Sequence, residues 1–452
     1  MNILVINGSP KGENSITVHT VKYLEKIFTS HSFSYLNVGQ TIKSIERDFS
    51  NAEAMLSSAD FLLFSYPVYT FIAPSQLHRF IELIKESGVD ISGKYATQIT
   101  TSKHFYDVTA HKYIEENCLD MGLRYIKGLS ADMNDLLTKK GREEAEQFFY
   151  YIEHCVRNNI YAKAKAPASH FVPSVPTELN GEYMPKNRKY DTVIITDSTD
   201  DDSNVSKMIR NFRSVYPFAT RVINISDYPF SGGCLGCFMC AVSGKCVYKD
   251  GFDEFLRQEI QTASAIVYAF EIRDHSMGSR FKMYDDRNFC NGHRTVTVGT
   301  PVGYLVSGRY SEESNLRMII EGRSSVGGNF LAGVATDEVD ADREIDELSK
   351  NLVFALRNKY TVPQDFFGVG GMKIFRDLIF EMRGMMRADH KFYKKHKQYD
   401  FPQKKFLSSL KMYLVGMLLG NEKIRNKVGP QMKEGMIAPY RKMLEKMDEQ
   451  KK

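Results

Sequence analysis

The chain has 452 residues, 42% of them hydrophobic and 25% charged, and a formal net charge of +5. This composition is typical of a soluble globular protein, and the length predicts two domains with an extension. No apolar run reaches the roughly 18–20 residues that a transmembrane helix needs, and Met1 leads directly into an apolar run with no signal-peptide pattern. Since the seven cysteines are also an odd number, we expect a protein of the reducing cytoplasm.

The first feature along the chain is an anion-binding pattern. Residues 3–6 are an apolar run that predicts a buried strand, residues 8–17 read GSPKGENSIT, and a helical pattern follows to about residue 28. Backbone N–H groups and the dipole at a helix N-terminus favour an anion, and Lys11 adds a full positive charge. The glycine spacing matches neither the dinucleotide fingerprint nor a P-loop. A glycine turn that only caps the helix remains the alternative.

Two further strand ends carry polar loops. Residues 61–64 predict a strand that ends in SYPVYT (65–70), with a helix from about 74 to 84. Residues 95–99 predict another strand, which ends in TTSKH (100–104). In open α/β sheets, ligands bind at the carboxyl ends of the strands, which is where flavodoxin-like proteins hold FMN. We therefore expect these three loops to form one site.

The run GSPKGENSIT followed by YPVYTFIAPSQLHRFIE resembles the NAD(P)H-dependent FMN reductases of the flavodoxin-like superfamily. The resemblance covers roughly residues 1–155 and 189–355. It implies that the FMN phosphate is held by Ser9, Lys11, Asn14, Ser15 and Thr17. It implies that the isoalloxazine ring is surrounded by Pro67, Val68, Tyr69 and Thr70, and that a third side is closed by Thr101, Ser102 and His104.

Tyr69 and His104 are the candidate catalytic residues, with His104 placed to donate to the pyrimidine edge of the flavin; a surface loop histidine is the alternative interpretation. The chain departs from the family pattern at two positions. Lys11 stands where many relatives have Arg, which replaces a bidentate contact by a point charge. Glu13 must point to solvent if a phosphate is bound.

The architecture then repeats. Residues 1–158 form the first predicted domain, and residues 159–188 are a proline-containing linker. Residues 189–360 again alternate strands (near 192–195, 220–225, 265–270, 295–306 and 330–335) with helices. The sequence therefore predicts an α/β fold of two tandem flavodoxin-like, doubly wound parallel sheets.

The second predicted domain carries four cysteines in C-x2-C-x2-C-x5-C spacing: Cys234, Cys237, Cys240 and Cys246. Four closely spaced thiolates are typical of Fe–S ligation, whereas structural zinc usually has two separated pairs. This motif also resembles that of the iron–sulfur flavoproteins, which implies a [4Fe–4S] cluster. A zinc site and a metal-free, packed or redox-active thiol loop remain open. We interpret the other cysteines, Cys118, Cys155 and Cys290, as buried small apolar residues.

The first loop of the second domain, TDSTDDDSN (196–204), has four carboxylates and no basic residue. Such a loop repels a phosphate. We therefore expect one FMN per chain, bound by the first domain, and a cluster on the second. Because electron transfer between them requires proximity, we expect the cysteine loop to face residues 67–70 and 100–104, in the same chain or in a dimer.

Residues 361–452 are a basic extension. Apolar residues of its first part share one helical face, and residues 406–419 are nearly all apolar. Such a segment is a candidate for peripheral contact with an anionic membrane; helices that pack on the α/β domains or on a second subunit are the alternative. No nucleic-acid recognition fold accompanies the basic residues.

Two functions are consistent with these features. The first is an FMN-dependent oxidoreductase that moves electrons from NAD(P)H or a ferredoxin, through FMN and a cluster, to a small electrophilic acceptor. The second is an electron-transfer module that serves a redox protein partner and has no small organic substrate. We expect a homo-oligomer in either case.

Overall fold

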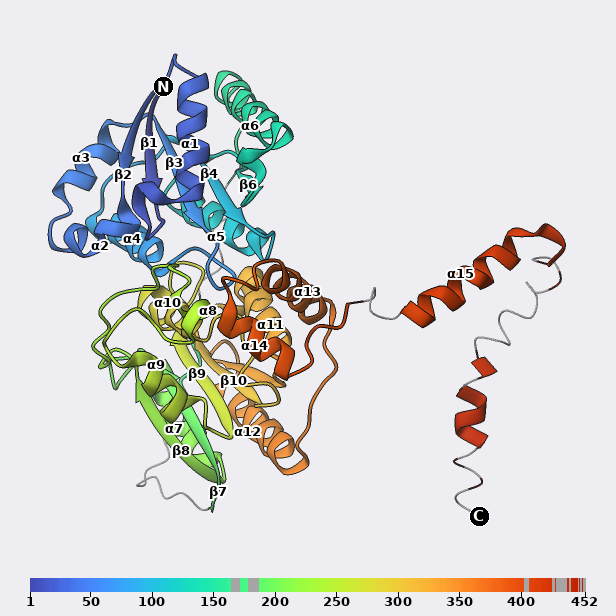
Figure 1. Cartoon of the computed structure of the whole chain (residues 1–452). Coiled ribbons are helices and arrows are strands. Elements are labelled where there is room, and N and C mark those ends of the chain that lie inside the picture. The colour runs from blue at the N-terminus through green and yellow to red at the C-terminus, as the bar shows by residue number, and fades with distance from the viewer. Residues whose placement is uncertain are drawn as a thin grey trace. The chain divides into compact units, whose positions relative to one another are not determined.

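The structure, a computed structural model, describes residues 1–163, 171–177, 187–401 and 406–424, and beyond them residues 427, 437–438, 440–445, 447 and 449. Most of the predicted linker (159–188) lies outside the described residues. The chain divides into two compact units, residues 1–392 and 393–452. The first unit contains both α/β domains, which Figure 1 shows in blue to cyan and in green to orange.

The first domain is built on a parallel sheet of order β2-β1-β3-β4-β5, with β6 pairing with β4. Its strands are β1 (Asn2–Asn7), β2 (Ser32–Leu36), β3 (Phe61–Pro67), β4 (Tyr95–Ser102), β5 (Arg124–Tyr125) and β6 (Leu129–Asp132). Its helices are α1 (Ile16–Ile27), α2 (Val38–Arg47), α3 (Ser50–Ser58), α4 (Ser75–Ser87), α5 (Asp107–Asp120) and α6 (Lys139–Arg157).

Helices cover both faces of this sheet. Because successive strand residues point to opposite faces, Ile3 and Val5 pack in the core under α1 and α6, whereas Leu4 and Ile6 pack in the core under α2 to α5. All four side chains are at most 2% exposed. This two-sided burial explains why the strand reads as an unbroken apolar run.

The second domain has the sheet order β11-β10-β9-β7-β8, also entirely parallel. Its strands are β7 (Asn187–Thr196), β8 (Phe218–Asn224), β9 (Ala265–Glu271), β10 (Val302–Ser307) and β11 (Leu331–Thr336). Its helices are α7 (Asn204–Val215), α8 (Met239–Ser243), α9 (Phe252–Phe255), α10 (Gly278–Arg287), α11 (Ser314–Gly327) and α12 (Ala341–Asn358). Both sheets have the 2-1-3-4-5 order of flavodoxin-like folds, which confirms the predicted tandem architecture.

One predicted strand is shorter than expected. The sequence predicts a strand across residues 295–306, but β10 begins at Val302. The preceding segment contains a short 3-10 helix, Asn288–Asn291, and turns around Gly292 and Gly299, both of which have positive φ. Residues 288–294 follow helix α10, and Phe289, Cys290 and His293 among them line the candidate site.

The two domains pack against each other in equivalent ways. The loop after β3 has positive φ at Thr70 and Phe71, and the loop after β9 has positive φ at Asp274 and His275. Thr70 Oγ1 lies 2.8 Å from the Asp286 carboxylate of the second domain, and Asp274 in turn lies 2.7 Å from Lys85 Nζ of the first. The helices that follow these two loops, α4 and α10, are each also hydrogen-bonded at their first turn to the opposite domain.

Ser75 N, at the start of α4, donates to Asp286 (2.8 Å), and Ser279 N, in the first turn of α10, donates to Glu82 (2.7 Å). Helices α4 and α10 pack directly against each other. The chain therefore contains an internal pseudo-dimer whose strand-end loops face the opposite domain.

The C-terminal part begins with α13 (Phe366–Glu381) and α14 (Arg387–Lys395), followed by α15 (Phe406–Gly420). Helix α13 packs on α11, and its Met372 and Phe375 contact the core of the first domain. Ile379 and Met386 are fully buried. The part of the extension up to residue 392 thus packs on the α/β domains. Within the part of the chain that the structure describes, no helix has the length and apolarity required to cross a bilayer.

Candidate active site

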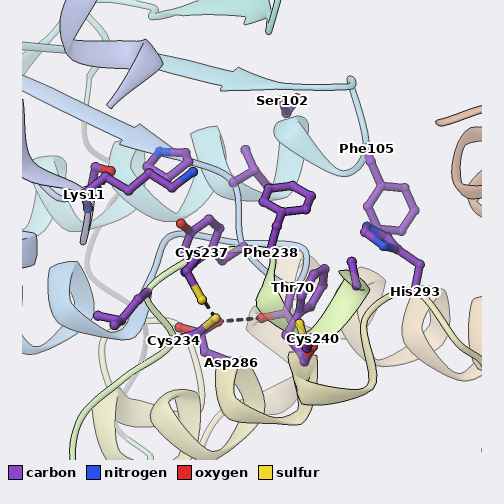
Figure 2. Close-up of a pocket in the computed structure, with 18 of the residues that line it drawn as sticks. Lys11, Thr70, Ser102, Phe105, Cys234, Cys237, Phe238, Cys240, Asp286 and His293 are labelled. Atoms are coloured by element: carbon purple, nitrogen blue, oxygen red, sulfur yellow. Dashed lines mark hydrogen bonds between the residues drawn. The ribbon is translucent and has the colours of Figure 1, made fainter. Parts of the chain in front are cut away.

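An apolar cavity lies where the strand ends of the first domain meet the second domain. It encloses about 230 Å³. Its walls come from the loops after β1, β3 and β4, from the cysteine loop (residues 231–250), from residues 286–293 and from α13. Figure 2 shows Lys11 at one end, His293 and Phe105 at the other, and Cys234, Cys237 and Cys240 along one side.

The loop after β1 forms the polar end of the cavity. Ser9, Lys11 and Ser15 line it, and the two serines are at most 2% exposed. Ser15 is the N-cap of α1, and its hydroxyl makes no capping hydrogen bond. The first amides of α1 therefore face this end with no capping side chain, a typical setting for an anion. Glu13 is exposed and pairs with Lys22 at 3.4 Å, which keeps its charge out of the cavity.

Two residues that the family resemblance assigns to the phosphate do not line the cavity. Asn14 is exposed. Thr17 is buried, and its hydroxyl lies 2.6 Å from the Thr101 hydroxyl. Thr17 thus joins the first and third loops beneath the cavity floor.

The loop after β3 lines the cavity with Pro67, Val68, Tyr69 and Thr70, as the resemblance implies. The second domain holds this loop in its left-handed conformation. Lys282 Nζ donates to the Tyr69 carbonyl oxygen (3.1 Å), and the Arg323 guanidinium donates to that of Thr70 (2.8 Å). Lys282 is itself fully buried and ion-paired with Asp286. The shape of this loop consequently depends on the second domain.

Burial, with the nearby Cys234 and Asp286, raises the pKa of Tyr69 well above its usual value, so its hydroxyl stays protonated. The cysteine loop approaches this hydroxyl closely: Gly236 has a positive φ of 60°, and a Cβ there would collide with the Tyr69 oxygen. Glycine is therefore required at position 236 both by the positive φ and by the close approach of the Tyr69 hydroxyl.

The loop after β4 contributes Thr101 and Ser102, together with Lys103 and Phe105. His104 does not line the cavity. Its side chain is 53% exposed, and its Nδ1 lies 2.9 Å from Asp107. The structure thus brings Tyr69, but not His104, to the cavity wall.

Arg287 fixes both ends of the cysteine loop. Its guanidinium donates to the Gly232 carbonyl oxygen (2.9 Å) and to the Asp250 carboxylate (2.8 Å). The Arg287 side chain is 1% exposed and that of Asp250 is 5% exposed. Although burial opposes ionisation, hydrogen bonds from Arg287 lower the pKa of Asp250 to about 2. The loop is therefore closed by a buried ion pair.

All four cysteines of the motif line the cavity, and Cys290 joins them. Burial is the main reason that the pKa of Cys234 rises to about 12, that of Cys240 to about 11 and that of Cys290 to about 12. Asp286 adds to the shift at Cys234, and Asp389 adds to it at Cys240. Cys234, Cys240 and Cys290 are thus neutral near pH 7 when no metal is bound.

The sulfur positions bear on the choice of metal. Tetrahedral zinc, with Zn–S of about 2.3 Å, places its sulfur ligands about 3.8 Å apart. Among the described residues, no three cysteine sulfurs lie within 4.8 Å of one another. The thiols therefore do not form a closed zinc site.

Sequence reasoning missed the contributions of Cys290, His293, Asp286 and the α13 residues Ile374, Phe375 and Leu378. The run FCNGH (289–293) offered one signal, since it places a cysteine and a histidine around a glycine. Nothing in the sequence shows that this run meets the cysteine loop.

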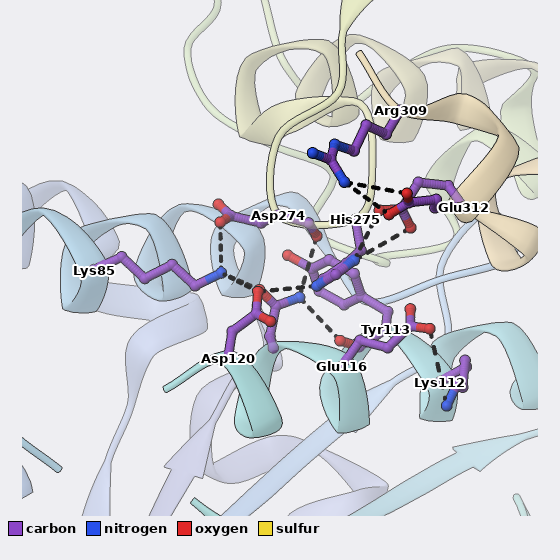
Figure 3. A network of polar contacts seen from close by, with 11 residues as sticks. Lys85, Lys112, Tyr113, Glu116, Asp120, Asp274, His275, Arg309 and Glu312 are labelled. Carbon is purple, nitrogen blue, oxygen red and sulfur yellow. Dashed lines mark hydrogen bonds and ion pairs between the residues drawn. The ribbon is translucent and has the colours of Figure 1, made fainter. Parts of the chain in front are cut away.

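A second polar cluster joins the domains away from the cavity (Figure 3). His275 lies 2.9 Å from Asp120 through Nε2 and 2.9 Å from Glu313 through Nδ1. Burial disfavours the charged ring, but hydrogen bonds to Asp120 and Glu313 raise the pKa of His275 to about 10. One ligand atom each from Glu116, His275 and Glu313 lies within 4.8 Å of the others. Because both ring nitrogens already serve carboxylates, we interpret the cluster as an interdomain ion pair.

Residues 1–133 match a family model described as "Flavodoxin-like fold". The match confirms this fold for the first domain. No curated protein matches the chain.

Solved structures that are similar to about a third of the chain include the following three. One is the FMN-dependent NADH-azoreductase from Bacillus anthracis in complex with FMN, with 15% identity, coverage of 34% of this chain and 99% of that chain, and a TM-score of 0.28. Another is the general stress protein 14 from Treponema denticola in complex with FMN, with 11% identity, coverage of 34% of this chain and 99% of that chain, and a TM-score of 0.29. A third is the NAD(P)H:quinone oxidoreductase from Methanothermobacter marburgensis, with 12% identity, coverage of 36% of this chain and 97% of that chain, and a TM-score of 0.27.

Proposed function

We propose that this chain, whose first domain has the flavodoxin-like fold, is an FMN-dependent oxidoreductase that passes electrons from NAD(P)H to a small electrophilic acceptor. One observation carries the proposal. The three strand-end loops of the first domain line a single apolar cavity whose opposite wall carries five thiols from the second domain. The cavity thus joins an end that offers donors to an anion and a wall that carries thiols, which supports an electron-transfer role.

The residues present fit FMN. Ser9, Lys11, Ser15 and the first turn of α1 offer donors and positive charge to a phosphate. The 67–71 loop and Phe105 offer apolar contacts to a flavin ring. Bound there, FMN would supply the ability to accept a hydride and to release electrons singly. Tyr69, held protonated, is placed to act as a hydrogen-bond donor in the cavity.

The second domain does not offer an equivalent site, which supports one FMN per chain. Ser203, the N-cap of α7, accepts a hydrogen bond from Ser206 N, so its side chain already caps the helix. The hydroxyls of Ser198, Ser203 and Ser206 also bond one another. Burial raises the pKa of Asp197 to about 6 in the same loop. The polar groups of this loop are therefore already hydrogen-bonded to one another and to the start of α7.

The thiol wall supports a [4Fe–4S] cluster as the second centre, held by Cys234, Cys237, Cys240 and Cys246. Four thiols from one short loop are the donor set that such clusters use, and their spread along the wall suits a group larger than a zinc ion. Iron and sulfide analysis of anaerobically reconstituted protein tests this step: about four irons per chain are expected, and Cys237→Ala should lose them while keeping FMN. Less than about one iron per chain would leave the metal-free thiol wall as the correct interpretation.

The alternative is an electron-transfer module that serves a redox protein partner and has no small organic substrate. A partly enclosed cavity lined by Phe71, Phe105 and Phe238 favours a small acceptor instead. An apolar wall of this kind excludes water from the reacting groups.

Anaerobic turnover of FMN-loaded protein tests the proposal. Oxidation of NADH or NADPH should depend on both FMN and an added naphthoquinone or ferricyanide. A protein that holds FMN but is reduced by neither nicotinamide would contradict the proposed activity and favour the module. The predicted homo-oligomer is checked in the same samples by light scattering.

A further inference from the structure

Another cavity, smaller than the candidate active site, lies in the second domain between its sheet and helices α10 and α11. It encloses about 100 Å³, which is room for about three water molecules at the roughly 30 Å³ that each occupies in the liquid. Tyr268 of β9 and Tyr304 of β10 line it. They are register partners on neighbouring strands, so their side chains share one face of the sheet, and their ring centroids lie 5.1 Å apart. The two phenol groups therefore lie side by side at the cavity.

Neither of these tyrosine hydroxyls has a hydrogen-bond partner among the residues that the structure describes. Tyr304 is 5% exposed and Tyr268 is partly buried. Burial raises the pKa of Tyr268 to about 12 and also raises that of Tyr304 above its usual value, so both hydroxyls stay protonated near neutral pH.

A buried tyrosine hydroxyl usually finds a partner. In the first domain, the buried Tyr66 hydroxyl lies 2.6 Å from Gln98 Oε1 and 2.9 Å from the Ala110 carbonyl oxygen. The equivalent need of Tyr268 and Tyr304 is met by no group within the described ranges of the chain. Partners for these two hydroxyls must therefore come from a molecule that enters the cavity.

The Arg323 guanidinium brings a positive charge to the same cavity. Its Nη2 donates to the Thr70 carbonyl oxygen (2.8 Å) and to the Asp285 carboxylate (2.6 Å). Its Nη1 makes no hydrogen bond with the described part of the chain. Because Nη2 is held by two acceptors, the orientation of the guanidinium is fixed before a ligand binds, which lowers the cost of binding.

The charges around Arg323 are balanced. Asp285 lies 3.3 Å from Lys282 Nζ as well as 2.6 Å from Arg323, and Lys282 is also ion-paired with Asp286, so two cations face two carboxylates. Recognition of a ligand here depends on the donors that contact it and not on a net charge. The other walls are largely apolar and include Phe270, Met277, Phe281 and Val302.

We propose that this cavity binds a short-chain carboxylate such as acetate or propionate. A carboxylate brings two oxygen acceptors and no donor, which complements a guanidinium nitrogen beside two hydroxyls. The apolar walls suit its alkyl end, and the volume limits that end to a few carbons. The binding requires neither FMN nor turnover. Arg323 would hold the carboxylate and the 67–71 loop of the candidate active site at the same time, since it already donates to the Thr70 carbonyl oxygen.

NMR of the full-length, flavin-free protein tests the site, with every tyrosine labelled with ¹³C at the ring carbon that bears the hydroxyl. Tyr268→Phe and Tyr304→Phe each remove one signal, which assigns the two resonances. Sodium propionate should shift both signals in a saturable manner, whereas sodium chloride at the same ionic strength should not. Tyr69 lines the candidate active site, so its signal reports propionate that binds there instead.

Each of the two variants should weaken propionate binding by at least about tenfold, because it removes one hydrogen bond to a charged group. The remaining tyrosine signal of the pair gives the affinity. Tyr66→Phe is the matched control, since it removes a buried hydroxyl whose partners belong to the first domain, and it should leave the affinity unchanged. Propionate should also raise the midpoint of thermal unfolding of the unsubstituted protein and of Tyr66→Phe, and raise that of Tyr304→Phe much less.

Three results would overturn the proposal. Tyr268 and Tyr304 signals that propionate does not shift would show that the cavity holds only water. Equal shifts with propionamide, the neutral amide of the same size, would contradict the assignment to a carboxylate. An affinity that is unchanged in both Tyr268→Phe and Tyr304→Phe would place the binding outside this cavity.

Discussion

Thiols that line one cavity differ sharply in their exposure. Cys237 is exposed, whereas Cys290 is 3% exposed and Cys234 and Cys240 are partly covered. Burial and the carboxylates of Asp286 and Asp389 disfavour the thiolates. A reactive thiolate usually sits in an electropositive environment. The residues around this wall therefore keep Cys234 and Cys240 protonated and do not activate them as nucleophiles. As thiols, they remain available to a metal or to an oxidant.

Alkylation of the metal-free protein tests this view. At pH 8, pKa values of about 12 for Cys234 and about 11 for Cys240 leave thiolate fractions of roughly 10⁻⁴ to 10⁻³. Iodoacetamide should therefore modify Cys237 first, and the rates at Cys234 and Cys240 should rise about tenfold per pH unit up to pH 10. Peptide mass spectrometry gives each rate. Equal rates for Cys234 and Cys237 at pH 8 would contradict the expected order.

At the scale of the elements, the cysteine loop is held by one buried ion pair. Asp250→Asn leaves the Arg287 guanidinium buried without its counter-charge, and breaking such a pair costs roughly 3–5 kcal/mol. We expect a loss of about 3 kcal/mol in the free energy of unfolding, measured by urea denaturation at pH 7. Asp227→Asn, at an exposed aspartate nearby, should change it little.

The same pair has a defined pH dependence. The folded-state pKa of Asp250, about 2, is below the unfolded value of 3.8. Its contribution is therefore present above about pH 3.8 and is lost as the pH falls through 2. The difference in stability between the unsubstituted protein and Asp250→Asn should shrink over this range. A difference that stays constant down to pH 2 would exclude the pair as its source.

Helix α15 has fewer charged residues than α13 and α14. It has 15 residues, with Lys411 as its one charged side chain, and Leu414 and Leu418 are about half exposed. Its length of about 22 Å is shorter than a bilayer core of about 30 Å. A helix of this kind suits insertion into one leaflet, and the basic residues of the extension suit an anionic surface.

Vesicle co-sedimentation of the full chain tests the membrane proposal. We expect binding to anionic vesicles that weakens several-fold as salt rises from 50 to 200 mM. Leu414→Glu with Leu418→Glu should abolish it. Val298→Glu with Val339→Glu makes the same charge change at exposed apolar residues of the second domain and should not. Binding that survives the α15 substitutions would assign α15 to another partner, such as a second copy of the chain.

Much of the element order could be predicted from local patterns. The apolar runs at residues 3–6, 61–64 and 192–195 became central strands because parallel strands with both faces covered are apolar throughout. The cysteine loop was also expected to face the strand ends of the first domain, and the cavity places it there in the same chain. His293, Cys290 and Phe375 were missed because their partners lie far away in sequence. His293 and Asp389, for example, are 96 residues apart.

At the scale of the whole molecule, the two domains hold each other's strand-end loops. The second domain sets the shape of the 67–71 loop through Lys282 and Arg323. The first domain receives His275 between its own Asp120 and Glu313 of the second domain. The candidate site is therefore a property of the domain pair.

The His275 cluster predicts an alkaline loss of stability. The folded pKa of His275, about 10, is above the unfolded value of 6.5. Its contribution is fully present below pH 6.5 and is lost as the pH rises through 10. Because the ring is partly exposed, we expect on the order of 2 kcal/mol between pH 6.5 and 10. His275→Gln should remove this difference in urea unfolding, and a decline of the same size in His275→Gln would place its origin elsewhere.

The central claim is that one FMN binds per chain, at the loop after β1. Titration of the flavin-free protein with FMN, followed by flavin fluorescence, tests it most directly. We expect saturation at one FMN per chain and a loss of at least about 100-fold in affinity in Lys11→Ala with Ser15→Ala, because a charged donor and a hydroxyl donor at the start of α1 are both removed. Two FMN per chain, or unchanged affinity in the double variant, would contradict the account.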